Sequence, residues 1–192
     1  MTSVNLITGV VLLATLAAGC GGEGSRPAGE AAVKQDALRT RTDAARGRLW
    51  VLSLDDVRVY DAASKRLIRK IELPGWSAAG PTCPPDLVLD RAGSAYVSST
   101  VTPKLWRIDT STLKAEEIRI TLVDREQWEV GFGALAFTPD GSLLAVTALA
   151  GTLWKLDVDS GGARMVGQGA HLLKVCELTE PFLNDFDRKV KP

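Results

Sequence analysis

The sequence predicts an all-β fold built from about three four-stranded antiparallel sheets, and three observations lead to this prediction. A segment that ends in aspartate recurs every 48 residues, at Asp61, Asp109 and Asp157. Short runs rich in Val, Ile, Leu, Thr, Tyr and Trp, which β-strands prefer, surround each copy. After residue 45, glycines and prolines interrupt the chain too often for a long helical period, which excludes a helical fold.

Each copy of the repeat contains four strand candidates in the same order. In chain order they lie at residues 38–42, 47–51, 57–61 and 67–73, then at 86–90, 93–97, 105–109 and 115–122, then at 134–138, 141–145, 153–157 and 163–167. A glycine opens the second strand of every copy. Gly93 and Gly141 keep the 48-residue spacing, whereas Gly47 is displaced by two residues, which indicates a hairpin loop of different length in the first copy.

Four short strands joined by tight turns and repeated in this way are typical of a β-propeller blade. Such a blade exposes apolar residues on both faces and becomes stable by stacking on its neighbours. Trp106 and Trp154 occupy equivalent positions, so we expect both to pack between blades. The predicted blades cover about residues 38–75, 84–123 and 133–168 of a repeat domain at 35–192, and partial strands are expected at 171–187.

The repeated phrases are also similar to those of a known family. The segments AYVSS…LWRIDTST, FTPDGSLLAV and VRVYDAASKRLIRKIELPG resemble blades of the YVTN-type bacterial propellers. Those blades have a Pro-Asp-Gly turn, a strand near Tyr-Val and a Val-x-Asp strand that leads into a turn. The resemblance covers roughly residues 38–167 and implies an architecture rather than one activity, because such blades serve many purposes.

The number of blades is low for a ring, because closed propellers need at least about four. We therefore expect a small or partial propeller. Its open edges would be covered by a second copy or by another partner, since bare edges promote aggregation. The alternative is that the sequence is a truncated fragment of a larger propeller.

The N-terminal residues predict export and lipidation. Residues 6–18 form an apolar run of about 13 residues, whereas a helix needs roughly 20 to cross a membrane, so residues 1–19 are interpreted as a signal peptide. The run ends in Leu-Ala-Ala-Gly before Cys20, which resembles the lipobox of bacterial lipoproteins. That resemblance implies lipidation of the Cys20 thiol; a cysteine that merely follows an ordinary leader is the alternative.

Residues 20–34 are rich in glycine and predict a flexible tether behind the lipid anchor. The resemblance to lipoproteins implies an extracytoplasmic location, on the periplasmic side of the outer membrane or at the cell surface. Gly21, directly after the lipidated cysteine, is not the aspartate that favours inner-membrane retention. The partners expected are therefore the membrane, through the lipid, and a second copy or an exported protein.

Two cysteines remain if Cys20 carries lipid. Cys83 and Cys176 are an even number in an oxidising compartment, so a disulfide between them is allowed. Two separate buried thiols explain the same residues equally well, because sequence cannot show that their Cα atoms lie within bonding range.

Charge and residue types limit the chemistry. The 23 basic residues balance the 23 acidic ones, which excludes a broad electrostatic attraction for nucleic acid. His171 is the single histidine, and no nucleophile elbow, histidine pair or Cys-x-x-Cys motif is present. Residues 157–162 resemble a calcium loop superficially but are better explained as a hairpin turn. We therefore predict no catalytic residue, no metal ligand and no cofactor.

The connections between blades are the candidate binding loops, because loops carry function in many propellers. Trp76, Trp128 and Phe132 lie in these connections, where aromatic side chains often anchor contacts. Their alternative role is to cover the blade stack. The sequence thus favours a non-catalytic binding or scaffold module that recognises an exported protein or a surface component. The alternative is a metal-dependent, gluconolactonase-like hydrolase, although Asn5 and Asn184 are the only asparagines that could join carboxylates at a metal.

Overall fold

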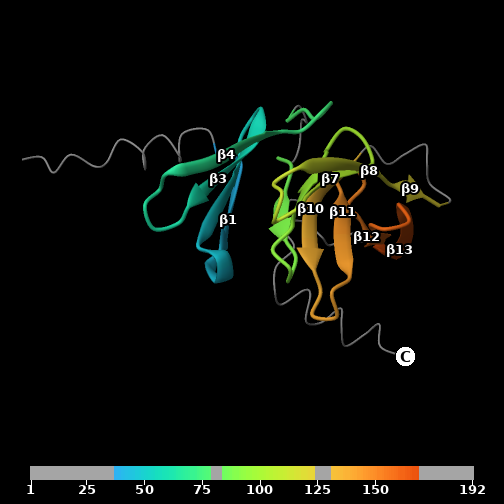
Figure 1. Ribbon diagram of the computed structural model, residues 1–192. Helices are drawn as coiled ribbons and strands as arrows, with labels where there is room; N and C mark the ends of the chain where they lie inside the picture. Colours follow the sequence, from blue (N-terminus) through green and yellow to red (C-terminus); the bar gives the residue numbers. More distant parts are fainter. Residues whose placement is uncertain (1–36, 79–83, 124–130, 169–192) are drawn as a thin grey trace, which may run out of the picture.

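Three consecutive antiparallel sheets form the body of the molecule (Figure 1). The computed structural model describes residues 37–78, 84–123 and 131–168. Each sheet contains four strands in chain order, and the third gains one short extra strand at its outer edge. This arrangement confirms the predicted all-β fold class, a partial propeller of three four-stranded blades, which we call blades 1, 2 and 3.

The strands alternate with tight turns in all three blades. Blade 1 contains β1 (Arg39–Asp43), β2 (Arg48–Leu52), β3 (Asp56–Asp61) and β4 (Leu67–Glu72), with a single 3-10 turn, η1 (Ala44–Arg46), after β1. Blade 2 contains β5 (Leu87–Leu89), β6 (Ala95–Ser98), β7 (Lys104–Ile108) and β8 (Ala115–Arg119). Blade 3 contains β10 (Phe132–Phe137), β11 (Leu143–Thr147), β12 (Thr152–Asp157) and β13 (Gly162–Gln168), and β9 (Thr121–Leu122) lies at its edge.

One predicted strand is wrong in its extent. The sequence predicts a continuous strand at residues 115–122, but the structure ends β8 at Arg119 and begins β9 at Thr121. The chain bends here because β9 leaves blade 2 and pairs in parallel with β13 of blade 3. The Thr121 amide donates to the Gly161 carbonyl at 2.8 Å, and a Cβ at Gly161 would lie 2.6 Å from the Arg119 carbonyl oxygen. This close approach requires glycine and joins the two blades at their outer edge.

Two apolar cores lie between the blades. Trp106, which is 1% exposed, belongs to the core between blades 1 and 2, together with Trp50 and Val97. Trp154, which is fully buried, belongs to the core between blades 2 and 3, together with Leu105. Successive residues of a strand point to opposite faces, so blade 2 supplies side chains to both cores. The prediction that Trp106 and Trp154 pack between blades is confirmed.

The repeated aspartates close the turn between the third and fourth strands of each blade. The Asp109 carboxylate accepts hydrogen bonds from the hydroxyl of Ser111 at 2.6 Å and from the amide of Thr112 at 2.7 Å. Hydrogen bonds donated by Ser111 and Thr112 hold the pKa of Asp109 well below its ordinary value. Asp61 and Asp157 make equivalent bonds to the residues that follow them. The 48-residue repeat of the sequence therefore corresponds to the same turn, repeated once in each blade.

The same turns place one residue of each blade in the left-handed region. Lys65 has a φ of 57°, Leu113 of 53° and Gly161 of 71°, and these positions are again 48 residues apart. Lys and Leu carry a Cβ and are strained in this conformation, whereas glycine is not. Lys65 is exposed, so its side chain does not complicate a test of this strain.

Replacing Lys65 with glycine should stabilise the protein by about 0.5–1 kcal/mol. The reason is that relief of left-handed strain exceeds the extra chain entropy that glycine loses on folding. Urea unfolding monitored by tryptophan fluorescence measures the difference. Lys65→Ala, which keeps the Cβ, is the matched control and should show no gain; a gain equal to that of the glycine variant would contradict the explanation.

Candidate functional site

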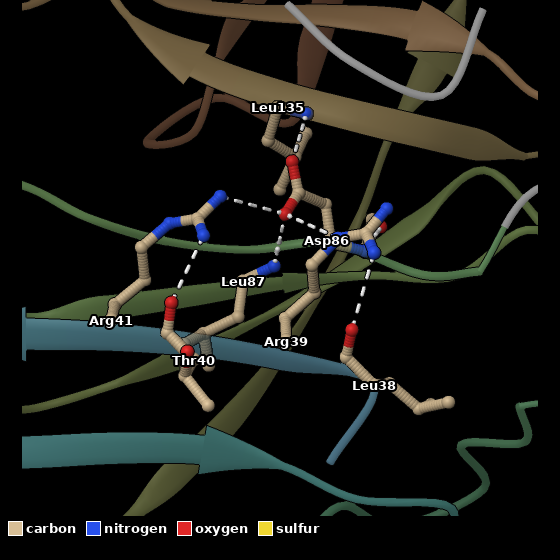
Figure 2. Close-up of polar contacts among 8 residues, drawn as sticks. Leu38, Arg39, Thr40, Arg41, Asp86, Leu87 and Leu135 are labelled. Atoms are coloured by element: carbon tan, nitrogen blue, oxygen red, sulfur yellow. Dashed lines mark hydrogen bonds and ion pairs between the residues drawn. The ribbon is translucent and has the colours of Figure 1, made fainter. Parts of the chain in front are cut away.

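The first strands of the three blades, β1, β5 and β10, lie side by side, and one carboxylate joins them (Figure 2). Asp86 directly precedes β5 and is only 4% exposed. Its backbone is fixed within blade 2, because its amide donates to the Ser98 hydroxyl at 2.7 Å and its carbonyl accepts from the Ser98 amide at 3.0 Å. The carboxylate is thereby held at the junction of all three blades.

Four N–H groups from three blades surround the Asp86 carboxylate (Figure 2). From blade 1, Arg41 Nη2 donates to Oδ1 at 3.2 Å, and Arg39 Nε lies 3.4 Å from the same oxygen. The amide of Leu87 donates to Oδ1 at 2.8 Å within blade 2. From blade 3, the amide of Leu135 donates to Oδ2 at 3.0 Å.

These contacts give the Asp86 carboxylate a structural role. Both oxygens accept hydrogen bonds from the protein and two guanidinium groups lie against the carboxylate, so its acceptor positions are used within the fold. The two arginines leave a net positive charge beside the first strands, and the Arg41 side chain is 40% exposed. We interpret the cluster as a polar joint that sets the spacing of the blades rather than as a catalytic centre.

A cleft of about 720 Å³ lies between blades 2 and 3, at the turns that join the first two strands of each blade. Its lining residues are Leu89, Asp90, Arg91, Ala92, Tyr96, Phe137, Thr138, Pro139, Gly141 and Val158. The rings of Tyr96 and Phe137 meet edge to face at its base, with centroids 5.3 Å apart and planes at 70°. The Arg91 guanidinium donates to the Pro139 carbonyl and so connects the two turns.

The base of the cleft is polar on one side. Tyr96 is 5% exposed; its burial, and next the charge of Asp90, raise the pKa of its hydroxyl, so Tyr96 stays neutral. A second hollow of about 470 Å³ shares Tyr96 and Asp90 with the cleft and includes Arg107. Arg107 is paired with Glu116 at 3.0 Å and lies 3.7 Å from Asp159. The neutral hydroxyl of Tyr96, which both hollows share, therefore suits hydrogen bonding to a ligand better than proton transfer.

The turn at the cleft wall depends on an ionised carboxylate. Hydrogen bonds from the hydroxyl of Thr138, and next from the amide of Ser142, lower the pKa of Asp140 to about 2 from its ordinary 3.8. A depressed pKa means that ionised Asp140 stabilises the fold above pH 3.8, and that this contribution is lost as the pH falls toward about 2.

We therefore expect the carboxyl resonance of Asp140 to titrate with a midpoint near pH 2 in NMR spectra of the folded protein. Asp140→Asn should lower the unfolding free energy at pH 7, and the difference from the unsubstituted protein should shrink below about pH 4. A titration midpoint at the ordinary value of 3.8 would show that these hydrogen bonds are not made in solution.

The structure places two of the three predicted aromatic site residues. Trp76 is half-buried against the core between blades 1 and 2, and its Nε1 donates to the Ser98 carbonyl at 3.1 Å. Phe132 is fully buried in β10 and packs in the core between blades 2 and 3. Both positions correspond to the alternative role of covering the blade stack. Trp128 and the three cysteines, Cys20, Cys83 and Cys176, lie outside the described residues.

Sequence reasoning missed both the polar joint and the cleft. The signal for the joint was present, because Arg39 and Arg41 alternate along a strand and point to one face. Within the described residues, no group of three or more His, Cys, Asp or Glu side chains is arranged to hold a metal ion. Residues 157–162 form the predicted hairpin turn, in which the Asp157 carboxylate accepts from the amides of Asp159 and Ser160.

No helix in the described ranges 37–78, 84–123 and 131–168 is long and apolar enough to cross a membrane.

No protein-family model matches this chain, and no curated protein matches it. Among solved structures, hydrazine synthase of Kuenenia stuttgartiensis is 21% identical with a TM-score of 0.49, over 66% of this chain and 36% of that one. Virginiamycin B lyase of Staphylococcus aureus is 16% identical with a TM-score of 0.47, over 66% of this chain and 39% of that one. This chain thus spans less than two fifths of either structure, and its fold class rests on the three sheets described above.

Proposed function

We propose that this chain is a membrane-tethered, extracytoplasmic propeller-repeat lipoprotein that binds another exported protein or a surface component without catalysing a reaction. The anchor in this proposal is Cys20, behind the leader at residues 1–19, and residues 20–34 are the tether. The observation that supports the binding role is the cleft between blades 2 and 3. The resemblance of the repeated segments to YVTN-type blades also suits a binding module.

The cleft lies at the end of the blades opposite to the point where the chain enters blade 1. The chain enters blade 1 at Leu38, whose amide donates to the Leu52 carbonyl, at the end of β2 that leads toward β3. The cleft is formed by the turns at the other end, between β5 and β6 and between β10 and β11. A module anchored through its N-terminus would therefore present the cleft away from the membrane.

The size and rigidity of the cleft suit recognition of a protein segment. A volume of about 720 Å³ lies within the usual range of binding pockets, about 300–1,000 Å³. Both walls are tight turns fixed by aspartates: Asp90 accepts from the Ser94 amide at 2.8 Å, and Asp140 accepts from the Ser142 amide at 3.1 Å. A preformed pocket loses little conformational entropy on binding.

Photo-crosslinking in the intact, membrane-bound protein tests the binding role. A photoreactive amino acid in place of the exposed Ala92, at the cleft, should give one defined adduct in the producing cell. The matched control is Ala63, which is exposed in the turn of blade 1 and should give none. Equal adducts from both positions, or none from Ala92, would contradict a partner at the cleft.

A metal-dependent hydrolase would behave differently in a second measurement. Purified protein analysed for bound metal should contain no stoichiometric calcium or zinc. Tight stoichiometric metal together with hydrolysis of a lactone would replace the binding proposal with the gluconolactonase-like alternative.

A further inference from the structure

The loops between the second and third strands share one construction in all three blades. A buried hydroxyl residue stands at the first position of each loop or directly before it: Ser53, Ser99 and Thr147, at spacings of 46 and 48 residues. In blade 1 the Ser53 hydroxyl accepts from the Asp56 amide at 3.2 Å, and in blade 3 the Thr147 hydroxyl accepts from the Thr152 amide at 3.0 Å. The Ser99 hydroxyl accepts from the amides of Val101 and Thr102, both at 3.3 Å.

Each of these loops presents an exposed aliphatic side chain at its tip. Leu54 is 55% exposed, Val101 is 40% exposed and Leu149 is 64% exposed. Single exposed hydrophobic residues are common on protein surfaces and need no explanation. Here the exposed residue recurs at the same place in every blade, one or two residues after the buried hydroxyl. We call these three side chains the apolar rim.

The apolar rim lies at the end of the blades where the chain enters blade 1. The first strands begin at this end, because Asp86, at the start of β5, bonds to Arg39 at the start of β1. Arg39 pairs with Leu52, which is two residues before Leu54. Residues 21–38 connect Cys20 to this end and can span at most about 65 Å when fully extended.

The rim loops themselves carry almost no charge, whereas Arg39 and Arg41 leave a net positive charge beside the first strands. The three loops, residues 53–55, 99–103 and 148–151, contain one ionisable side chain, that of Asp55. A partner recognised through opposite charge would need complementary charges here, which these loops do not supply. Aliphatic side chains on rigid tips suit shallow contact with the apolar part of a lipid interface.

We propose that the apolar rim rests on the lipid surface to which Cys20 ties the chain, so that the blades stand on the membrane with their cleft facing outward. This inference rests on the lipid anchor of the proposed function. Three aliphatic tips alone bind a membrane weakly, but an anchored chain holds them at high local concentration beside it. Lipid and rim together then fix an orientation that a flexible tether alone does not.

Site-directed fluorescence tests this orientation in the full-length lipidated protein on neutral phosphatidylcholine vesicles. In a Cys83→Ser/Cys176→Ser background, a single new cysteine at Leu54, Val101 or Leu149 carries an environment-sensitive dye. The controls are cysteines at Ala63 and Ala92, which are exposed at the opposite end of the blades. We expect blue-shifted emission at all three rim positions when vesicles are added, and no shift at either control.

A matched pair of variants tests whether the blue shift depends on the apolar rim or only on the dye. With the dye at position 149, Leu54→Ser/Val101→Ser should abolish the blue shift because the remaining rim is lost. Leu67→Ser/Ile68→Ser should preserve it, because these residues are 49% and 46% exposed at the opposite end of blade 1.

The outcomes distinguish this inference from the lipid anchor. Protein that sediments with vesicles while its rim dyes stay in water overturns the inference and leaves the anchor intact. Protein that fails to sediment with vesicles contradicts the anchor itself. Blue-shifted rim dyes in Cys20→Ser protein without vesicles also overturn the inference, because the rim would then contact protein.

Discussion

Replacing Asp86 with alanine should lower the free energy of unfolding by about 3 kcal/mol, because it removes the one carboxylate that two guanidinium groups and two backbone amides share at the junction of the blades. The Asp86 carboxylate accepts from Arg41, Leu87 and Leu135 and pairs with Arg39, so one substitution removes contacts among all three blades. We place the effect at the lower end of the range for buried ion pairs, because the Arg41 side chain is 40% exposed. Urea unfolding at pH 7 measures it.

Two variants control this result. Asp55→Ala removes a carboxylate from an exposed loop and should change stability by no more than about 0.5 kcal/mol. Asp86→Asn keeps an acceptor oxygen and should fall between the two. An Asp86→Ala protein as stable as Asp55→Ala would mean that the blades do not depend on this joint.

Replacing Trp154 with alanine should cost about 3–5 kcal/mol, the usual effect of deleting a fully buried large aromatic side chain. The Trp154 ring is 0% exposed between blades 2 and 3, and its Nε1 donates to the Thr152 hydroxyl at 2.8 Å. The loss should reduce the stacking of blade 3 on blade 2, since blades gain stability from their neighbours. Thermal unfolding followed by circular dichroism measures the change.

Trp154→Phe is the matched control, because it keeps most of the apolar volume and removes only the indole donor. It should cost clearly less than the alanine variant. If both variants lose the same stability, the hydrogen bond to Thr152 rather than the packed volume dominates at this position.

The blade architecture could be predicted from sequence because its signals are local. The turn at Asp109 is closed by Ser111 and Thr112, two and three residues away, so the pattern that makes the turn is visible in the sequence. The packing of Trp106 and Trp154 followed from their equivalent places in the repeat. A period of 48 residues thus predicts strands, turns and stacked faces together.

The remaining features could not be predicted because they depend on contacts between distant segments. Asp86 meets Arg41 across 45 residues and Leu135 across 49, and no spacing rule in the sequence relates these positions. The cleft needs two turns from different blades, and β9 changes sheet only because Gly161 permits a close approach. Residue type alone predicts Trp76 and Phe132 as binding residues, whereas the structure places both against the blade cores.

Cell fractionation of a Cys20→Ser protein tests the proposed lipid anchor at Cys20 most directly. The unsubstituted protein should enter the membrane fraction and the detergent phase, whereas Cys20→Ser protein should be found in the aqueous fraction with unchanged unfolding. Cys83→Ser is the control and should remain with the membrane. Cys20→Ser protein that stays in the membrane fraction would contradict the anchor and, with it, the proposed orientation of the blades.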